Sequence, residues 1–369
     1  MPPVLSGPNV LSVVTGQGNN CVGLNLPCTG IGICNVSKCQ TVNGILVDTG
    51  SYGMRIFSDA LSISLPPVSN SSTIGECSYF GSMTAWGPVV SAKLSMGGEP
   101  SVTVPIQIIE PTFEGQYDSS GNPVASSPPC GSSPVASTSS SSGYSGLMGV
   151  GLFEYDCGSS CVGSTASGIY FSCGSNICSG VTAPLSIQVS NPVASLPVDN
   201  NGVVLSFPSV PSGGDASIVG TLTFGIGTES NNVPGSPSVF DTNTSAEVSV
   251  LFQGTSFPYS FIDSGSNAFY FQSSIPTCSS PNTYFYCPSA PESLTETMTG
   301  SNGTTLSSGI DVGNFNSVIA NGNSVYSNIG GSGSGGSFDL GLPFFFGKSV
   351  YVGINGFSSS LGTGPLWAY

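Results

Sequence analysis

Two copies of one short acidic turn constrain the fold of this chain more than any other feature of its sequence. The first copy is Asp48-Thr49-Gly50-Ser51, directly after the apolar run Ile45-Leu46-Val47. The second copy is Asp263-Ser264-Gly265-Ser266, directly after Ser260-Phe261-Ile262. One such turn is ordinary, because Asp and Ser cap backbone N–H groups and Gly adopts positive φ. Two copies, each after a strand-like run, predict a duplicated unit with one acidic turn in each half.

A later apolar segment that ends in glycine completes each half of this repeat. In the first half it is Leu147-Met148-Gly149, and in the second it is Asp339-Leu340-Gly341, where an acid takes the first position. A stretch with Pro and Asn at residues 191–201 precedes a new series of strand-like runs. We therefore expect an N-terminal lobe at residues 1–195 and a C-terminal lobe at residues 196–369, each large enough for its own core.

Composition favours strands over helices. Only 6% of the residues are charged, and 51 Gly and 28 Pro punctuate short runs of Val, Ile, Tyr, Phe and Thr. Because helix-favouring Glu, Lys and Arg are scarce, the chain is predicted to be all-β. Hydrophobic residues make up 38% of the chain, which supplies enough apolar surface for folded cores. Residues 119–143 are low in complexity and predict an exposed loop that serves as a spacer.

The charge balance excludes one class of partner. Four cationic residues against 19 carboxylates give a net charge of −15, so the chain would repel a nucleic acid. Acid mainly neutralises carboxylates that repel one another, and few ion pairs are lost with them. We therefore expect no nucleic-acid partner and a fold that tolerates acid.

The cysteines predict local disulfides and an oxidising compartment. The 12 cysteines form an even set, and the chain contains no histidine and no CxxC pair of the zinc-ribbon type, so neither a metal nor another cofactor is expected. The close pairs are Cys34 and Cys39, Cys157 and Cys161, Cys173 and Cys178, and Cys278 and Cys287. A secreted, periplasmic or cell-surface location follows from disulfide use.

The sequence contains no apolar run of the length that spans a membrane, so no transmembrane segment is expected. The chain opens with Met1-Pro2-Pro3 instead of the basic and apolar regions of a signal peptide. This opening predicts that a targeting segment has been removed.

The paired turns and the two segments that end in glycine resemble those of the pepsin-like aspartic peptidases. The resemblance implies a bilobal double β-barrel with an active-site cleft between the lobes, where Asp48 and Asp263 meet and act as the catalytic pair. Two adjacent carboxyl groups cannot both ionise cheaply, so they share one proton and titrate together, as in the aspartic-protease dyad that serves as the standard example. The ionised member activates a water, and the protonated member polarises the scissile carbonyl.

The same resemblance implies roles for the residues around the pair. Thr49 and Ser264 would tie the two turns together across the lobe interface. Ser51 and Ser266 would hydrogen-bond to the two carboxyl groups. Glycines at positions 50 and 265 (Gly50 and Gly265) would complete the turns. The partner would be a peptide or protein substrate, and a monomer is favoured.

A hairpin after the first turn resembles the flap of that family, which closes over bound peptide. Tyr79, followed by Phe80 and Gly81, would be the flap tyrosine, with Phe80 as the alternative. Arg55 stands where the family has a tryptophan, and it either pairs with a carboxylate near the site or lies on the surface. Asp339 would add a third carboxylate near the pair or in a substrate pocket, either protonated or favouring a cationic substrate side chain.

Two further stretches resemble a bacterial family of secreted proteins of unknown function. They are residues 151–161, which include Cys157 and Cys161, and residues 225–232. This likeness covers nearly the whole chain but implies no activity. Three functions are therefore weighed: a secreted aspartic endopeptidase acting at acidic pH, a catalytically silent protein that docks a peptide or protein in the interlobe cleft, and a structural surface protein.

Overall fold

A computed structural model describes residues 6–18, 20–69, 71–81, 83–114, 130, 136–175 and 177–369. Strands dominate it, which confirms the predicted all-β class. Of the predicted spacer at residues 119–143, only Cys130 and residues 136–143 fall within the described part, so most of that prediction lies outside the described residues.

One large sheet joins strands from both halves of the chain. In order across this sheet, the strands are β10 (Ile177–Gly180), β9 (Tyr170–Gly174), β5 (Thr73–Phe80), β6 (Met83–Ser95), β7 (Val102–Ile109), β4 (Tyr52–Phe57), β8 (Gly146–Val150), β3 (Cys39–Asp48), β2 (Pro27–Cys34), β1 (Val10–Gly16), β12 (Ser217–Phe224), β11 (Gly202–Ser206), β21 (Ser349–Gly353), β24 (Leu366–Ala368) and β13 (Val239–Asp241).

A second sheet is built wholly from the C-terminal half. In order, its strands are β18 (Thr305–Val312), β17 (Glu292–Thr299), β14 (Val248–Phe252), β15 (Thr255–Ile262), β20 (Asp339–Leu340), β16 (Phe269–Phe271) and β19 (Gly330–Ser332). A small ribbon pairs β22 (Ser358–Ser359) with β23 (Gly362–Thr363).

Helices are short in the described part of the chain. The α-helices are α1 (Ser139–Ser142), α2 (Ser159–Gly163) and α3 (Phe315–Val318). The 3-10 turns are η1 (Ser58–Ala60), η2 (Leu185–Ile187), η3 (Pro192–Ser195), η4 (Ile319–Asn321) and η5 (Leu342–Phe345). None of the described helices is long and apolar enough to cross a membrane.

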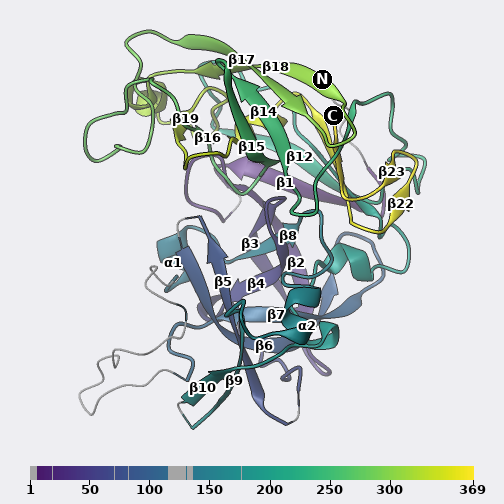
Figure 1. Ribbon diagram of the computed structural model, residues 1–369. Coiled ribbons are helices and arrows are strands. Elements are labelled where there is room, and N and C mark those ends of the chain that lie inside the picture. Colours follow the sequence, from purple (N-terminus) through teal and green to yellow (C-terminus); the bar gives the residue numbers. More distant parts are fainter. Residues whose placement is uncertain are drawn as a thin grey trace.

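The strands form two lobes that are joined by backbone pairing (Figure 1). Strand β1 comes from the start of the chain but pairs antiparallel with β12, so that Val10 lies opposite Thr223. On its other edge β1 pairs with β2 of the first lobe. The sheet is thus continuous from one lobe to the other. The lobe boundary near residue 195 stays a prediction.

The repeat predicted from the sequence is present in the strand pairing. In the first half, β3 runs parallel to β8, with Val47 opposite Met148, and β8 is antiparallel to β4. In the second half, β15 runs parallel to β20, with Ile262 opposite Leu340, and β20 is antiparallel to β16. Each acidic turn therefore follows the strand that runs parallel to the central strand of the same small arrangement, β3 in the first half and β15 in the second.

Buried apolar side chains on these strands fix the positions of the two acidic turns. Val47, Met148, Ile262 and Leu340 are all inaccessible to solvent and belong to one apolar cluster that extends through both lobes. Burying each such side chain contributes roughly 1.5–3 kcal/mol relative to leaving it exposed. The two turns are thus anchored on a shared core.

All 12 cysteines are paired in disulfides. The four close pairs predicted from the sequence are confirmed, and Cys21 pairs with Cys28. The sixth bond, between Cys77 and Cys130, is not local, because it connects strand β5 to a residue 53 positions away. Six disulfides point to an oxidising environment.

Candidate active site

The two acidic turns lie against each other across the lobe interface. The backbone N–H of Thr49 donates to Oγ of Ser264 at 3.1 Å, and the backbone N–H of Ser264 donates to Oγ1 of Thr49 at 2.9 Å. Each hydroxyl then donates to the strand of the opposite lobe, from Thr49 to the Ile262 carbonyl at 3.0 Å and from Ser264 to the Val47 carbonyl at 2.7 Å. These four reciprocal bonds are buried and fix the spacing of the turns.

The glycines of the turns allow the two carboxyl groups to approach. A Cβ atom at Gly50 would lie 2.5 Å from Cγ of Asp263, and one at Gly265 would lie 2.7 Å from Oδ1 of Asp48. Neither glycine has a positive φ, so the sequence-based reason for glycine at these positions was wrong. Glycine is required here because each turn packs directly on the opposite carboxyl group.

Matching hydrogen bonds orient the two carboxyl groups. Oδ1 of Asp48 accepts from the Gly50 N–H at 2.9 Å, and its Oδ2 accepts from the Ser51 hydroxyl. Oδ1 of Asp263 accepts from the Gly265 N–H at 2.7 Å, and its Oδ2 contacts the Ser266 hydroxyl at 2.8 Å. Each aspartate is thus held by its own turn while it faces the other.

Burial and mutual repulsion perturb the titration of the pair. Asp48 is only 7% exposed, while Asp263 is half-buried. Burial, followed by the charge of Asp263 and a hydrogen bond with it, raises the pKa of Asp48 well above its usual range. Burial and the two aspartates also raise the pKa of the nearby Tyr52 hydroxyl. Because Asp48 keeps its proton next to a second carboxyl group, the two aspartates are arranged to share one proton.

The third acid, Asp339, also lies at this site. Its Oδ2 is 2.6 Å from Oγ of Ser266, and its Oδ1 is buried without a hydrogen-bond partner. Burial, followed by the charge of Asp263, raises the pKa of Asp339 well above the usual range. Of the two sequence-based alternatives for Asp339, these contacts favour the protonated acid.

Arg55 lies inside the first lobe, so the surface alternative is wrong. It is 2% exposed, and its Nη2 contacts Glu76 at 2.5 Å and Asp156 at 3.1 Å. Its Nε donates to the Ser78 hydroxyl at 3.0 Å, and its Nη1 donates to the Tyr52 carbonyl at 2.7 Å. Four donations from Arg55 are directed to protein groups, and two of them reach Glu76 and Ser78 on β5, so Arg55 supports this strand of the hairpin.

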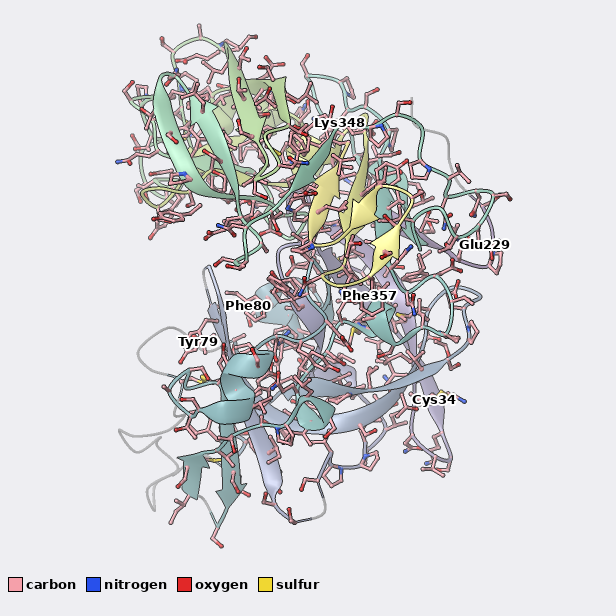
Figure 2. The ribbon with its side chains drawn as sticks, turned by 45° about the vertical axis from the view of Figure 1, so that its right-hand side comes forward. Cys34, Tyr79, Phe80, Glu229, Lys348 and Phe357 are labelled. Atoms are coloured by element: carbon pink, nitrogen blue, oxygen red, sulfur yellow. A yellow bond between two sulfur atoms is a disulfide. The ribbon has the colours of Figure 1, made fainter. Side chains whose placement is uncertain are left out.

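A hairpin is present where the flap is predicted, while its role as a flap and the choice of Tyr79 or Phe80 stay predictions. Strands β5 and β6 pair up to Phe80 opposite Met83, and Gly81 lies exposed at the tip. Tyr79 is 55% exposed, and its hydroxyl contacts Sγ of Cys77, so it lies on the strand face opposite Arg55. Phe80 lies on the other face, with its ring centroid 5.5 Å from the guanidinium of Arg55. The side chains alternate along the strand, and Phe80, not Tyr79, faces inward (Figure 2).

Sequence reasoning missed the acids that pair with Arg55. Glu76 is inaccessible to solvent on β5, and Tyr170 donates from its hydroxyl to Asp156 at 2.7 Å. The sequence carried one partial signal, because Glu76 and Ser78 are two residues apart and so share one face of a strand. It did not show that Arg55 is buried against that face. Among the described residues, no group of three or more His, Cys, Asp or Glu side chains is arranged to hold a metal ion.

Comparison with solved structures identifies the class of fold. The chain is similar to an aspartic proteinase from Irpex lacteus, with a TM-score of 0.50 and 15% sequence identity over 97% of this chain and 96% of that chain. At this identity the similarity shows the fold alone, which is the bilobal pepsin-like fold predicted from the paired turns.

The chain belongs to the family described as "Protein of unknown function (DUF3443)", which matches residues 6–369. No curated protein matches the chain. Family membership therefore supplies no activity, and the function has to be argued from the site.

Proposed function

We propose that this protein is a secreted aspartic endopeptidase in which Asp48 and Asp263 activate a water molecule. The observation that carries the proposal is the mutual packing of the two turns, with the glycine of each against the carboxyl group of the other. A fold that needed only two turns would not bring two like charges together, because their repulsion destabilises the folded state. Such an arrangement is selected where the pair does chemistry.

The chemistry follows from one proton shared between two carboxyl groups. The ionised carboxylate accepts a proton from the water as its oxygen attacks the scissile carbonyl carbon. The protonated carboxyl group donates its proton to the carbonyl oxygen, so that a neutral tetrahedral diol forms. Protonation of the leaving nitrogen and collapse of the diol then break the peptide bond. Each step uses only protons held by the two aspartates.

The surrounding residues support this reaction in separate ways. The reciprocal hydrogen bonds of Thr49 and Ser264 hold the carboxyl groups at a fixed separation. Phe80, on the face of the hairpin that carries Arg55, provides an apolar surface that packs against the buried cluster of Cys28, Leu46 and Leu147. Exclusion of water strengthens electrostatic interactions at such a site.

Cleavage of a denatured protein substrate across pH 3 to pH 7, with and without pepstatin, tests the proposal. Asp48→Asn and Asp263→Asn should each lower the rate at least about a thousandfold, as expected for loss of general acid–base catalysis. Asp311→Asn is the matched control, because Asp311 is exposed and accepts a hydrogen bond from Ser293. Cleavage that survives both active-site substitutions would exclude the mechanism.

Absence of cleavage by the native protein at every pH would favour the alternative of a silent docking protein. Screening a peptide library for binding to the native protein and to the Asp48→Asn variant separates a peptidase from a docking protein. A docking protein would bind the same peptides with and without the substitution.

A further inference from the structure

One hydroxyl group lies between two carboxyl groups in the second lobe. Oγ of Ser266 is 2.8 Å from Oδ2 of Asp263 and 2.6 Å from Oδ2 of Asp339. A serine hydroxyl carries one proton, so it can donate to only one of these oxygens. The other oxygen must donate to Ser266, which requires a proton on that carboxyl group. At least one of the two aspartates is therefore protonated in this arrangement.

The environments of the two carboxyl groups determine which one holds the proton. Asp263 has two donors available, the Gly265 N–H to Oδ1 and the Ser266 hydroxyl to Oδ2, and both favour its ionised form. Among the described residues, the shared Ser266 hydroxyl is the one possible donor to Asp339, and the Oδ1 of Asp339 is buried without a partner. An ionised carboxylate with a buried and unpaired oxygen is strongly disfavoured. The proton therefore belongs on Oδ2 of Asp339.

We propose that Asp339 is a positioning residue: it holds a proton, donates it as a hydrogen bond to Ser266, and thereby directs the Ser266 hydroxyl to Asp263. This chain of donors keeps Asp263 as the ionised member of the pair. Asp48 has matching donors in Gly50 and Ser51 but is more deeply buried than Asp263, so Asp48 is the protonated member. The inference rests on the proposed peptidase function and assigns unequal roles within it. Asp263 then takes the proton from water, Asp48 gives its proton to the carbonyl oxygen, and Asp339 keeps its own.

The groups that face Asp339 are consistent with this assignment. Asp263 follows β15, which pairs parallel with β20, the strand that carries Asp339. Asp48, on the other side of the lobe interface, is the second acid whose charge acts on Asp339. From β16, Tyr270 lies directly opposite Asp339, but its hydroxyl donates to Oδ1 of Asn267 at 2.6 Å. Burial, followed by Asp339 and Asp263, raises the pKa of Tyr270, so this neighbour stays neutral. Among the described residues no cation lowers the pKa of Asp339, while burial and the charges of Asp263 and Asp48 raise it.

Infrared spectroscopy of the free protein tests the protonation directly and needs no activity. The carbonyl stretch of a protonated carboxyl group should persist above about pH 5, where exposed carboxyl groups are ionised. The difference spectrum between native protein and Asp339→Asn should contain this band. Asp311→Asn is the matched control and should remove no such band. An Asp339→Asn spectrum that keeps the full band intensity would overturn the inference.

The pH dependence of kcat/KM tests the positioning role. Asparagine at position 339 still donates to Ser266, so Asp339→Asn should keep kcat within about threefold at acidic pH. Because asparagine cannot ionise, the alkaline limb of the kcat/KM profile should shift to higher pH. Asp339→Leu removes the donor and should lower kcat about tenfold, the effect of weakening a hydrogen bond to a charged group. Native kcat and an unchanged alkaline limb in both variants would contradict the role.

The two experiments separate failure of this inference from failure of the proposed function. If Asp48→Asn abolishes cleavage while both Asp339 variants behave as native protein, the peptidase proposal stands and the inference fails. If the native protein cleaves nothing, the infrared band alone decides whether Asp339 holds the proton.

Discussion

The two lobes use one strand arrangement but place charge in it differently. In the first lobe, Leu147 of β8 lies opposite Leu46 on one side and opposite Arg55 of β4 on the other. In the second lobe, Asp339 of β20 takes the position of Leu147, and Tyr270 of β16 takes that of Arg55. The first lobe therefore carries a buried cation away from the pair, while the second carries a buried acid next to it.

In the proposed mechanism, this difference gives the two similar turns unequal roles. Ser51 contacts one carboxyl group, that of Asp48, while Ser266 contacts two, those of Asp263 and Asp339. The other hydrogen-bond partners of Asp48 and Asp263 are equivalent, one backbone N–H and one serine hydroxyl for each. The two lobes differ at the next contact, where Asp339 fixes the direction of the Ser266 hydroxyl and no acid contacts Ser51 in the same way among the described residues.

The largest expected effect concerns the buried cation of the first lobe. Arg55→Met leaves Glu76 and Asp156 buried without their cation, which should lower the free energy of unfolding by about 3–5 kcal/mol. The counterpart in the second lobe, Tyr270→Phe, loses one hydrogen bond and should cost about 1 kcal/mol. Urea unfolding at neutral pH measures both values. Equal losses in the two variants would show that the lobes do not differ as described.

The next effect concerns the glycines, where the lobes should behave alike. Gly50→Ala and Gly265→Ala each place a Cβ atom against the opposite carboxyl group and force the pair apart. A displacement of about 1 Å at reacting groups lowers the rate roughly a hundredfold, and we expect that loss in kcat for both variants. Gly235→Ala is the control, because a Cβ atom there meets nothing within 4 Å. Unimpaired turnover in either variant would argue against the close approach of the carboxyl groups.

A buried acid remote from the pair predicts how stability depends on pH. Glu296 on β17 is inaccessible to solvent, and burial, opposed by Lys348, raises its pKa to about 7 from the usual 4.5 of a glutamate. The folded state holds a proton that the unfolded state releases within this window, so stability falls as pH rises from 4.5 to about 7.

Glu296→Gln should remove this dependence, with a relative gain of about 2 kcal/mol between pH 5 and pH 7. Thermal unfolding of native and variant protein at both pH values measures the gain. An identical pH dependence in the two proteins would mean that Glu296 is not buried as described.

The smallest effect compares the two serines directly. Ser266→Ala removes a hydrogen bond to an ionised carboxylate and should lower kcat/KM about tenfold, while Ser51→Ala removes one from a protonated carboxyl group and should lower it about threefold. Steady-state kinetics at one acidic pH measures both. A larger loss in Ser51→Ala would reverse the assignment of Asp48 and Asp263.

The sequence is most informative where the chemistry is local. Each acidic turn and the strand before it could be predicted because the apolar run, the acid and the glycine are adjacent in the chain. The repeat could be predicted because both halves keep the same order of elements. The hairpin could be located, but the inward side chain could not, since a shift of one residue along a strand exchanges Tyr79 with Phe80.

Contacts between distant residues outside the two paired turns could not be predicted. Arg55 is buried because Asp156, 101 residues away, approaches it together with Glu76. Asp339 reaches Ser266 across 73 residues, and Cys130 reaches Cys77 across 53. Nothing in the local composition around these residues specifies such partners.

Neutron diffraction from crystals of the native protein grown at acidic pH tests the whole arrangement most directly, because it locates exchanged protons on individual carboxyl oxygens. We predict deuterium on Asp48 and on Oδ2 of Asp339, and none on Asp263, with the Ser266 hydroxyl directed to Asp263. Deuterium on Asp263 with an ionised Asp339, or carboxyl groups of Asp48 and Asp263 too far apart to share a hydrogen bond, would contradict the account.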